Sequence, residues 1–167
     1  MRGDERAPIT IVAFIDFECP YSQKGYSIFA DVMRRYEPVA RVVFKHMPVE
    51  LLHPNARQAS LAAACANAQG KFWEYYDLLF TERQLDTASL NTYATQLGLN
   101  GQQFSDCLVS AQFGNAVDQD FADGAALGVA GTPTYFVNGT KIEGVVGADV
   151  WDDVIVSQLQ TAQQGTP

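Results

Sequence analysis

The side chain best placed to do chemistry is Cys19, which lies between two predicted elements. Residues 9–17 are rich in β-branched and aromatic types, as in a buried strand. Residues 23–35 read as a helix, and Pro20 just before them marks its start, which puts the Cys19 thiol at the first helical position. Backbone N–H groups at the start of a helix have no partner within it and form the positive end of its dipole. A thiolate is stabilised there relative to the thiol, so Cys19 is a candidate nucleophile. The alternative is a buried structural cysteine, because free cysteine is among the most buried residue types.

The elements that must position Cys19 form a strand–helix–strand unit. Residues 9–17, 21–36 and 39–47 show these patterns in that order, and the crossover between the two strands should be right-handed. After Pro54 the pattern changes, because residues 55–127 contain only helical stretches. We interpret this block as a helical insertion that forms a cap beside Cys19.

The sheet pattern resumes near the C-terminus. Two short strands are expected at 134–137 and 140–145, joined by the turn dipeptide Asn138-Gly139, and a last helix is expected at 147–160. The chain therefore reads as an α/β protein. We expect a single domain over residues 1–167, with a core at about 9–54 and 128–160 and an insertion at about 55–127.

Three motifs resemble the DsbA-type thiol–disulfide oxidoreductases, a branch of the thioredoxin superfamily. Residues 17–21, Phe-Glu-Cys-Pro-Tyr, are similar to the active-site turn, which Pro20 and Tyr21 complete. Residues 128–139 are similar to the loop and strand in which that superfamily places a cis-proline facing the active cysteine, and residues 69–74 resemble part of the helical insertion. The resemblance implies a thioredoxin fold with the insertion between its βαβ and ββα halves. It also implies a cis Pro133 and a substrate-binding role for Thr132 and Pro133.

Ser22 departs from the family pattern, because the redox motif of that family is Cys-x-x-Cys and the fourth position here is serine. A serine cannot resolve a mixed disulfide, but its hydroxyl could donate a hydrogen bond to the Cys19 sulfur and favour the thiolate. Three explanations are open. Ser22 is an engineered replacement, or it belongs to a natural monothiol enzyme that uses glutathione or another external thiol, or the protein has lost redox cycling. We favour the monothiol enzyme.

The other two cysteines, Cys65 and Cys107, lie in predicted helices of the insertion. They are either two buried thiols or a structural disulfide, and we favour the disulfide in an oxidising compartment. The resemblance points to the same compartment, since DsbA-type proteins mostly work outside the cytoplasm, in the periplasm or as secreted proteins. Residues 1–7 are too short and too charged for a signal peptide, so we expect none in this chain.

The remaining polar candidates carry weaker signals. Lys45 and His46 lie on the second predicted strand, and His53 precedes Pro54. A Cys–His pair would suggest protease-like or acyl-transfer chemistry, but no oxyanion-hole pattern accompanies the two histidines, so His46 is expected to pack or cap locally. Asp16 is either a buried modulator of Cys19 or a turn residue, and Glu18 is expected to be exposed to solvent. The two histidines and three cysteines are scattered without the short paired spacing of a zinc site, so no metal is expected.

Composition limits the partners. The formal net charge of −8 argues against nucleic acid, and no apolar stretch approaches the length of a membrane span. We expect a monomer that acts on protein or peptide thiols and disulfides, without a bound cofactor and with glutathione as a candidate co-substrate; a membrane redox partner is a further candidate. Two rival functions are a glutathione-dependent transferase or isomerase of the kappa type and a non-catalytic peptide-binding or chaperone module.

Overall fold

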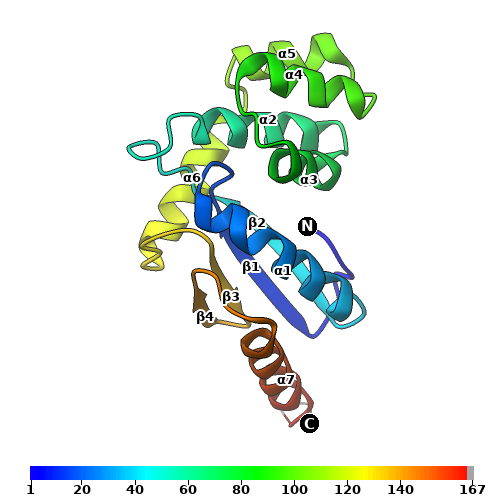
Figure 1. Cartoon of the computed structure of the whole chain (residues 1–167). Helices are drawn as coiled ribbons and strands as arrows, with labels where there is room; N and C mark the ends of the chain where they lie inside the picture. Colours follow the sequence, from blue (N-terminus) through cyan, green and yellow to red (C-terminus); the bar gives the residue numbers. More distant parts are fainter. Residues whose placement is uncertain (165–167) are drawn as a thin grey trace.

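A sheet with strand order β2-β1-β3-β4 forms the centre of the computed structural model, which describes residues 1–164 (Figure 1). The strands are β1 (Ile9–Ile15), β2 (Ala40–His46), β3 (Thr134–Val137) and β4 (Thr140–Glu143). β1 pairs in parallel with β2, from Ile9 opposite Ala40 to Ile15 opposite His46. β3 is antiparallel to both β1 and β4. The carboxyl ends of β1 and β2 therefore lie together at one end of the sheet.

Helices cover both faces of the sheet around β1. α1 (Pro20–Tyr36) and α7 (Ala148–Gln164) pack against each other, and α7 also contacts β1 and β3. On the other face, α6 (Gly114–Ala126) packs on β2. Side chains of β1 alternate between these layers: Ile11 and Ala13 belong to the main core, whereas Phe14 joins a smaller cluster with Met47 and Val129. Burial on both faces explains why β1 is an almost continuous apolar run.

The remaining helices form a layer at the end of the sheet, above the start of α1 in Figure 1. They are α2 (Ala56–Ala68), α3 (Phe72–Glu82), α4 (Thr87–Gln96) and α5 (Gly101–Val109). α2 lies at the centre of this layer and contacts α3, α4, α5 and α6. The predicted fold class is confirmed: an α/β thioredoxin-type sheet with helices inserted between its βαβ and ββα halves. α6 runs from the helical layer down onto the sheet, so it connects the two parts.

A disulfide joins Cys65 of α2 to Cys107 of α5, with the two Cα atoms 6.0 Å apart. Both residues are buried, with exposures of 1% and 6%. The bridge therefore links two helices across the interior of the helical layer.

Gly124 lets α6 approach the sheet closely. A Cβ atom added at this position would lie 2.8 Å from Met47 Sδ and 3.0 Å from a ring carbon of Phe14. We expect Gly124→Ala to lower the free energy of unfolding by about 1 kcal/mol, because overpacking of about 1–3 kcal/mol outweighs a helix-propensity gain of up to about 1 kcal/mol. Urea denaturation measures the change.

Gly101→Ala is the matched control for this prediction. Gly101 is also a helical glycine, at the start of α5, but a Cβ there would meet no atom within 4 Å. This variant should be as stable as the wild type or more stable. If the two variants shifted stability equally, close packing at Gly124 would not be the cause.

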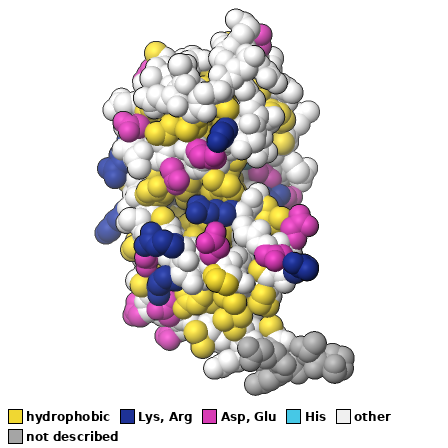
Figure 2. Space-filling view, turned by 90° about the vertical axis from the view of Figure 1, so that its right-hand side faces the viewer, with side chains coloured by type: hydrophobic (Ala, Val, Ile, Leu, Met, Phe, Trp, Pro, Cys, Tyr) yellow, Lys and Arg dark blue, Asp and Glu magenta, His cyan; other side chains and the backbone are white. Residues whose placement is uncertain are grey.

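The surface visible in Figure 2 carries acidic and basic side chains interspersed with hydrophobic ones, without an extended basic area on that face. Within residues 1–164, no helix has the length and apolar character needed to cross a membrane.

Candidate active site

Cys19 occupies the N-cap of α1, with Pro20 as the first helical residue. Its backbone is extended, at φ −63° and ψ 123°, and its carbonyl oxygen accepts a hydrogen bond from Gln23 N at 3.0 Å. The sequence placed the thiol at the first helical position, and this is wrong by one residue. Proline disfavours the helical conformation in the residue before it, so Cys19 stays just outside the helix.

The Cys19 sulfur faces the loop between α6 and β3. Its thiol donates a hydrogen bond to the Thr132 carbonyl oxygen, with an Sγ–O distance of 3.2 Å. The Thr132–Pro133 peptide bond is cis, and the Pro133 ring lies beside Gly25 of α1. Cys19 and Thr132 are 5% and 7% exposed. Tertiary contact thus joins a thiol and a backbone carbonyl that are 113 residues apart in the chain.

The rest of the turn divides between surface and interior. Pro20 is exposed and Tyr21 is 65% exposed, so the Tyr21 side chain is accessible to solvent next to the buried Cys19 in the sequence. Ser22 is only 2% exposed, and its hydroxyl has no hydrogen-bond partner among the described residues. The predicted hydrogen bond from Ser22 to the Cys19 sulfur is therefore absent. The sulfur instead donates to Thr132 from outside the helix, whereas Ser22 is buried within the first turn.

Two carboxylates fasten this turn to the loop after β2. Asp16 is fully buried and accepts hydrogen bonds from the backbone N–H of Glu18 and of Val49, both at 2.8 Å. The same carboxylate lies 2.7 Å from His53 Nδ1. Asp16 is therefore a turn acceptor, as one of the two alternatives expected, and it is fully buried; modulation of Cys19 by this carboxylate stays a prediction.

Glu18 is half-buried, which corrects the expectation that it is exposed. Its carboxylate accepts hydrogen bonds from the backbone N–H and the side-chain amide of Asn55, at 2.6 and 2.9 Å. These contacts satisfy an N–H group at the start of α2, where the helix leaves its first donors unpaired. The sequence did not reveal this role for the pair, because 37 residues separate Glu18 from Asn55 and no short spacing marks them.

The predicted basic residues of β2 take different positions. Lys45 pairs with two carboxylates of α6, Asp120 at 2.7 Å and Asp123 at 2.9 Å. His46 is 7% exposed and packs among aromatic rings, as the sequence predicted for a locally packed histidine. Burial lowers the pKa of His46 to about 4, against a smaller opposing effect of Asp120. The described contacts include no bond between either histidine and Cys19, and the described residues hold no group of three side chains suited to a metal.

The burial of His46 predicts a loss of stability in acid. Its ring takes up a proton near pH 6.5 in the unfolded chain but near pH 4 in the folded protein. Between these values the unfolded state binds more protons, so the free energy of unfolding falls as the pH decreases through this window, by up to about 3 kcal/mol. Urea denaturation of the wild type and of His46→Phe from pH 7 to pH 4 measures it. The variant lacks the titrating ring, so equal pH slopes in the two proteins would contradict this assignment.

The position of the thiol opposite a cis-proline loop can be compared with known proteins. A family profile described as Thioredoxin matches residues 1–156. The chain belongs to the thioredoxin family. Solved structures share this thioredoxin fold over nearly the whole chain.

Three of these structures come from different bacteria. Oxidised BdbD from Bacillus subtilis has a TM-score of 0.86 at 23% identity, covering 95% of this chain and 91% of that one. Wolbachia pipientis α-DsbA1 has a TM-score of 0.84 at 18% identity, covering 96% and 90%. A thioredoxin-like oxidoreductase from Silicibacter pomeroyi has a TM-score of 0.83 at 22% identity, covering 98% and 91%. The resemblance to DsbA-type thioredoxin proteins is thus confirmed at the level of the fold.

Curated relatives of this thioredoxin chain carry the names of Na(+)/H(+) antiporters. The chain is 34% identical to a Na(+)/H(+) antiporter, NhaA 3, of Salinispora tropica over 98% of its own length, and 32% identical to the NhaA antiporter of Herminiimonas arsenicoxydans over 99%. It spans only 25% and 26% of those two proteins. The shared region is therefore about a quarter of each antiporter.

Proposed function

We propose that the chain is a thiol–disulfide oxidoreductase of the DsbA type that acts through Cys19. The observation that carries the proposal is the placement of the Cys19 sulfur, at the N-terminus of α1 and 3.2 Å from the Thr132 carbonyl oxygen. Cys19 thus lies next to the start of α1, where helices leave N–H groups without an intrahelical partner and present the positive end of their dipole. The fold shared with the thioredoxin-like oxidoreductase from Silicibacter pomeroyi supports the same class of reaction.

The proposed reaction is a nucleophilic exchange. Cys19 loses its proton and its contact with Thr132, because a carbonyl oxygen accepts from a thiol but repels a thiolate. The thiolate attacks one sulfur of a substrate disulfide, a new S–S bond forms, and the other substrate sulfur leaves as a thiolate and takes up a proton. The described hydrogen bonds leave the Thr132 N–H unused, so this group can pair with the backbone of an extended peptide.

An external thiol must complete the cycle. Ser22 offers no sulfur, and the other two cysteines are bonded to each other in the helical layer. We propose that glutathione or another thiol attacks the mixed disulfide on Cys19 and releases the substrate, which makes the protein a monothiol enzyme.

The proposed place of action is outside the cytoplasm, because structural disulfides such as Cys65–Cys107 persist in oxidising compartments. The similarity to part of several antiporters supports a membrane partner, which agrees with the membrane redox partner suggested by the sequence.

Capture of the mixed disulfide tests this function. The protein is incubated at neutral pH with a peptide whose single cysteine carries glutathione in disulfide linkage, and the products are analysed by peptide mapping and mass spectrometry. The expected result is an adduct on Cys19, which added glutathione removes. Absence of any adduct at Cys19 would overturn the proposal.

Ser22→Cys should convert the monothiol site into a dithiol. The resemblance to the Cys-x-x-Cys turn predicts that the new thiol attacks the mixed disulfide and forms a bridge between position 22 and Cys19, so the adduct disappears without added glutathione. Ser27→Cys, at an exposed position of the same helix, is the matched control and should retain the adduct. Persistence of the adduct in both variants would show that position 22 cannot resolve Cys19.

A further inference from the structure

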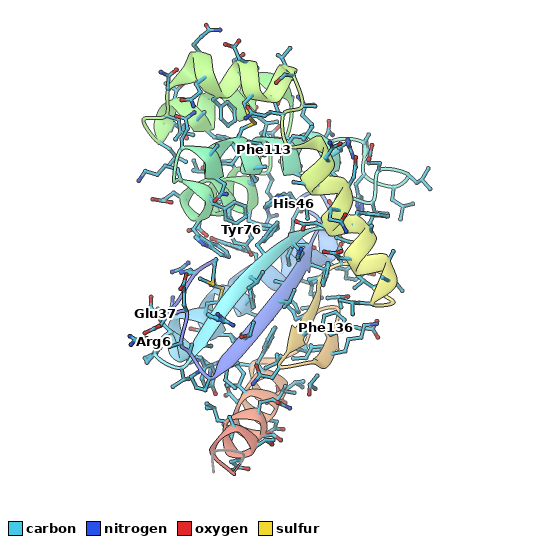
Figure 3. The ribbon with its side chains drawn as sticks, turned by 180° about the vertical axis from the view of Figure 1, so that it is seen from behind. Arg6, Glu37, His46, Tyr76, Phe113 and Phe136 are labelled. Carbon is cyan, nitrogen blue, oxygen red and sulfur yellow. A yellow bond between two sulfur atoms is a disulfide. The ribbon has the colours of Figure 1, made fainter. Side chains whose placement is uncertain are left out.

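A pocket lies away from the Cys19 turn, between the edge of β2 and the helical layer. It has a volume of about 210 Å³. Figure 3 shows two of its residues, His46 at the end of β2 and Phe113 at the start of α6, at the junction of the sheet and the helices. The side chains that line the pocket include aromatic, polar and small ones, among them Phe44, His46, Phe72, Phe113, Ala116 and Asp120.

The size and the walls of this β2–α6 pocket suit a flat apolar ring. Phe44 and Phe72 meet edge to face, with ring centroids 4.9 Å apart, and Phe113 contributes from α6. Aromatic rings prefer such edge and offset contacts with one another. For comparison, an enclosed apolar cavity of about 150 Å³ holds benzene. The space here is therefore sufficient for one substituted aromatic ring.

His46 brings unused hydrogen-bonding capacity to the pocket. The residue is more than nine-tenths buried, its Nδ1 has no partner, and no described hydrogen bond involves either ring nitrogen. A neutral imidazole has one donor and one acceptor. Burial keeps the ring uncharged at neutral pH, because it lowers the pKa of His46 to about 4. Buried polar groups in native proteins are almost always paired, but no described residue forms a hydrogen bond with the His46 ring. The ring can therefore pair with a bound ligand.

The charges at the pocket disfavour an anion. Asp120 lines the pocket, and its two carboxylate oxygens accept from Lys45 Nζ at 2.7 Å and from His46 N at 3.0 Å. Lys45 is shared with a second carboxylate, Asp123. Both carboxylates therefore occupy the Lys45 ammonium group, which is not free to pair with an incoming carboxylate, and such a ligand would lie near Asp120.

We propose that this pocket binds a compact uncharged aromatic molecule that carries a hydroxyl group, a ligand of the phenol class. The ring lies against Phe44, Phe72 and Phe113, and the hydroxyl group pairs with the imidazole of His46. The site uses none of the residues of the Cys19 turn, so it does not depend on the function proposed for that turn.

Binding of simple probes to the full chain tests this site. Phenol, toluene and benzoate are titrated separately and followed by the NMR signals of the His46 ring. Phenol should bind saturably and shift these signals. Toluene should bind roughly tenfold more weakly, the factor contributed by one net hydrogen bond. Benzoate should bind more weakly still. No saturable binding of phenol, or equal binding of phenol and toluene, would overturn the proposal.

Two variants locate the binding. Ala116→Leu adds bulk at an exposed wall position of α6 and should abolish phenol binding, whereas Ala122→Leu, exposed on the same helix but outside the pocket, should leave it unchanged. His46→Phe keeps a ring but removes both nitrogens, so phenol and toluene should bind it equally. Unchanged phenol binding in Ala116→Leu would overturn the site, and a retained preference for phenol in His46→Phe would overturn the role of the imidazole.

Discussion

Replacing Cys19 with alanine should abolish disulfide exchange completely. The other two cysteines are joined in a buried disulfide, so the variant would hold no free thiol among its described residues. Exchange requires a thiolate that attacks sulfur, and no oxygen nucleophile of the turn can replace it. The rate of glutathione release from a glutathionylated peptide, measured with and without the protein, should fall to the uncatalysed rate.

Tyr21→Phe provides the control for this loss. It changes an exposed residue next to Cys19 and keeps the thiol, so exchange should continue. Far-ultraviolet circular dichroism should show that the Cys19→Ala variant is folded, because the sulfur is removed from an N-cap that makes no side-chain cap bond. A Cys19→Ala variant that kept full activity and bound substrate peptide as well as the wild type would instead support the rival non-catalytic module.

Removing the Cys65–Cys107 disulfide should lower the free energy of unfolding more than any other change predicted here. The bridge closes a loop of 42 residues, and the chain-entropy description of a crosslink assigns about 4 kcal/mol to a loop of this length. The double variant Cys65→Ala, Cys107→Ala should lose about this free energy of unfolding in urea denaturation, with a further cost from the two small cavities it leaves. It should keep the Cys19 thiol available for labelling.

Reduction separates the crosslink from side-chain packing. In the presence of reductant the wild type also lacks the bridge but keeps both sulfur atoms, so its stability should fall most of the way to that of the double variant. A wild type that is equally stable with and without reductant, once loss of the bridge is verified by mass, would contradict a stabilising role for this disulfide.

Local chemistry made much of this protein readable from its sequence. The run before Cys19 and the proline after it predict a strand, a turn and a helix, because these signals act on neighbouring residues. The same applies to the hairpin at Asn138-Gly139, where both residues have positive φ, 46° and 92°, as a tight two-residue turn demands. The resemblance to DsbA-type proteins then ordered these pieces into a thioredoxin fold.

Only the tertiary structure decided which distant groups meet. Asp16 and Glu18 read as an ambiguous carboxylate and an exposed one. In the structure Asp16 is buried and Glu18 half-buried, and both accept hydrogen bonds from the loop after β2 or the start of α2. Ser22 read as a donor to Cys19, but its hydroxyl is buried without a partner among the described residues.

The physical reason lies in the range of the interactions. Helix starts, turns and strand patterns depend on residues a few positions apart, so composition and spacing record them. The contact of Cys19 with Thr132, the approach of α6 at Gly124 and the unpaired ring of His46 depend on how separate elements pack. Packing is settled by the shape and burial of the whole core, which no short stretch of sequence contains.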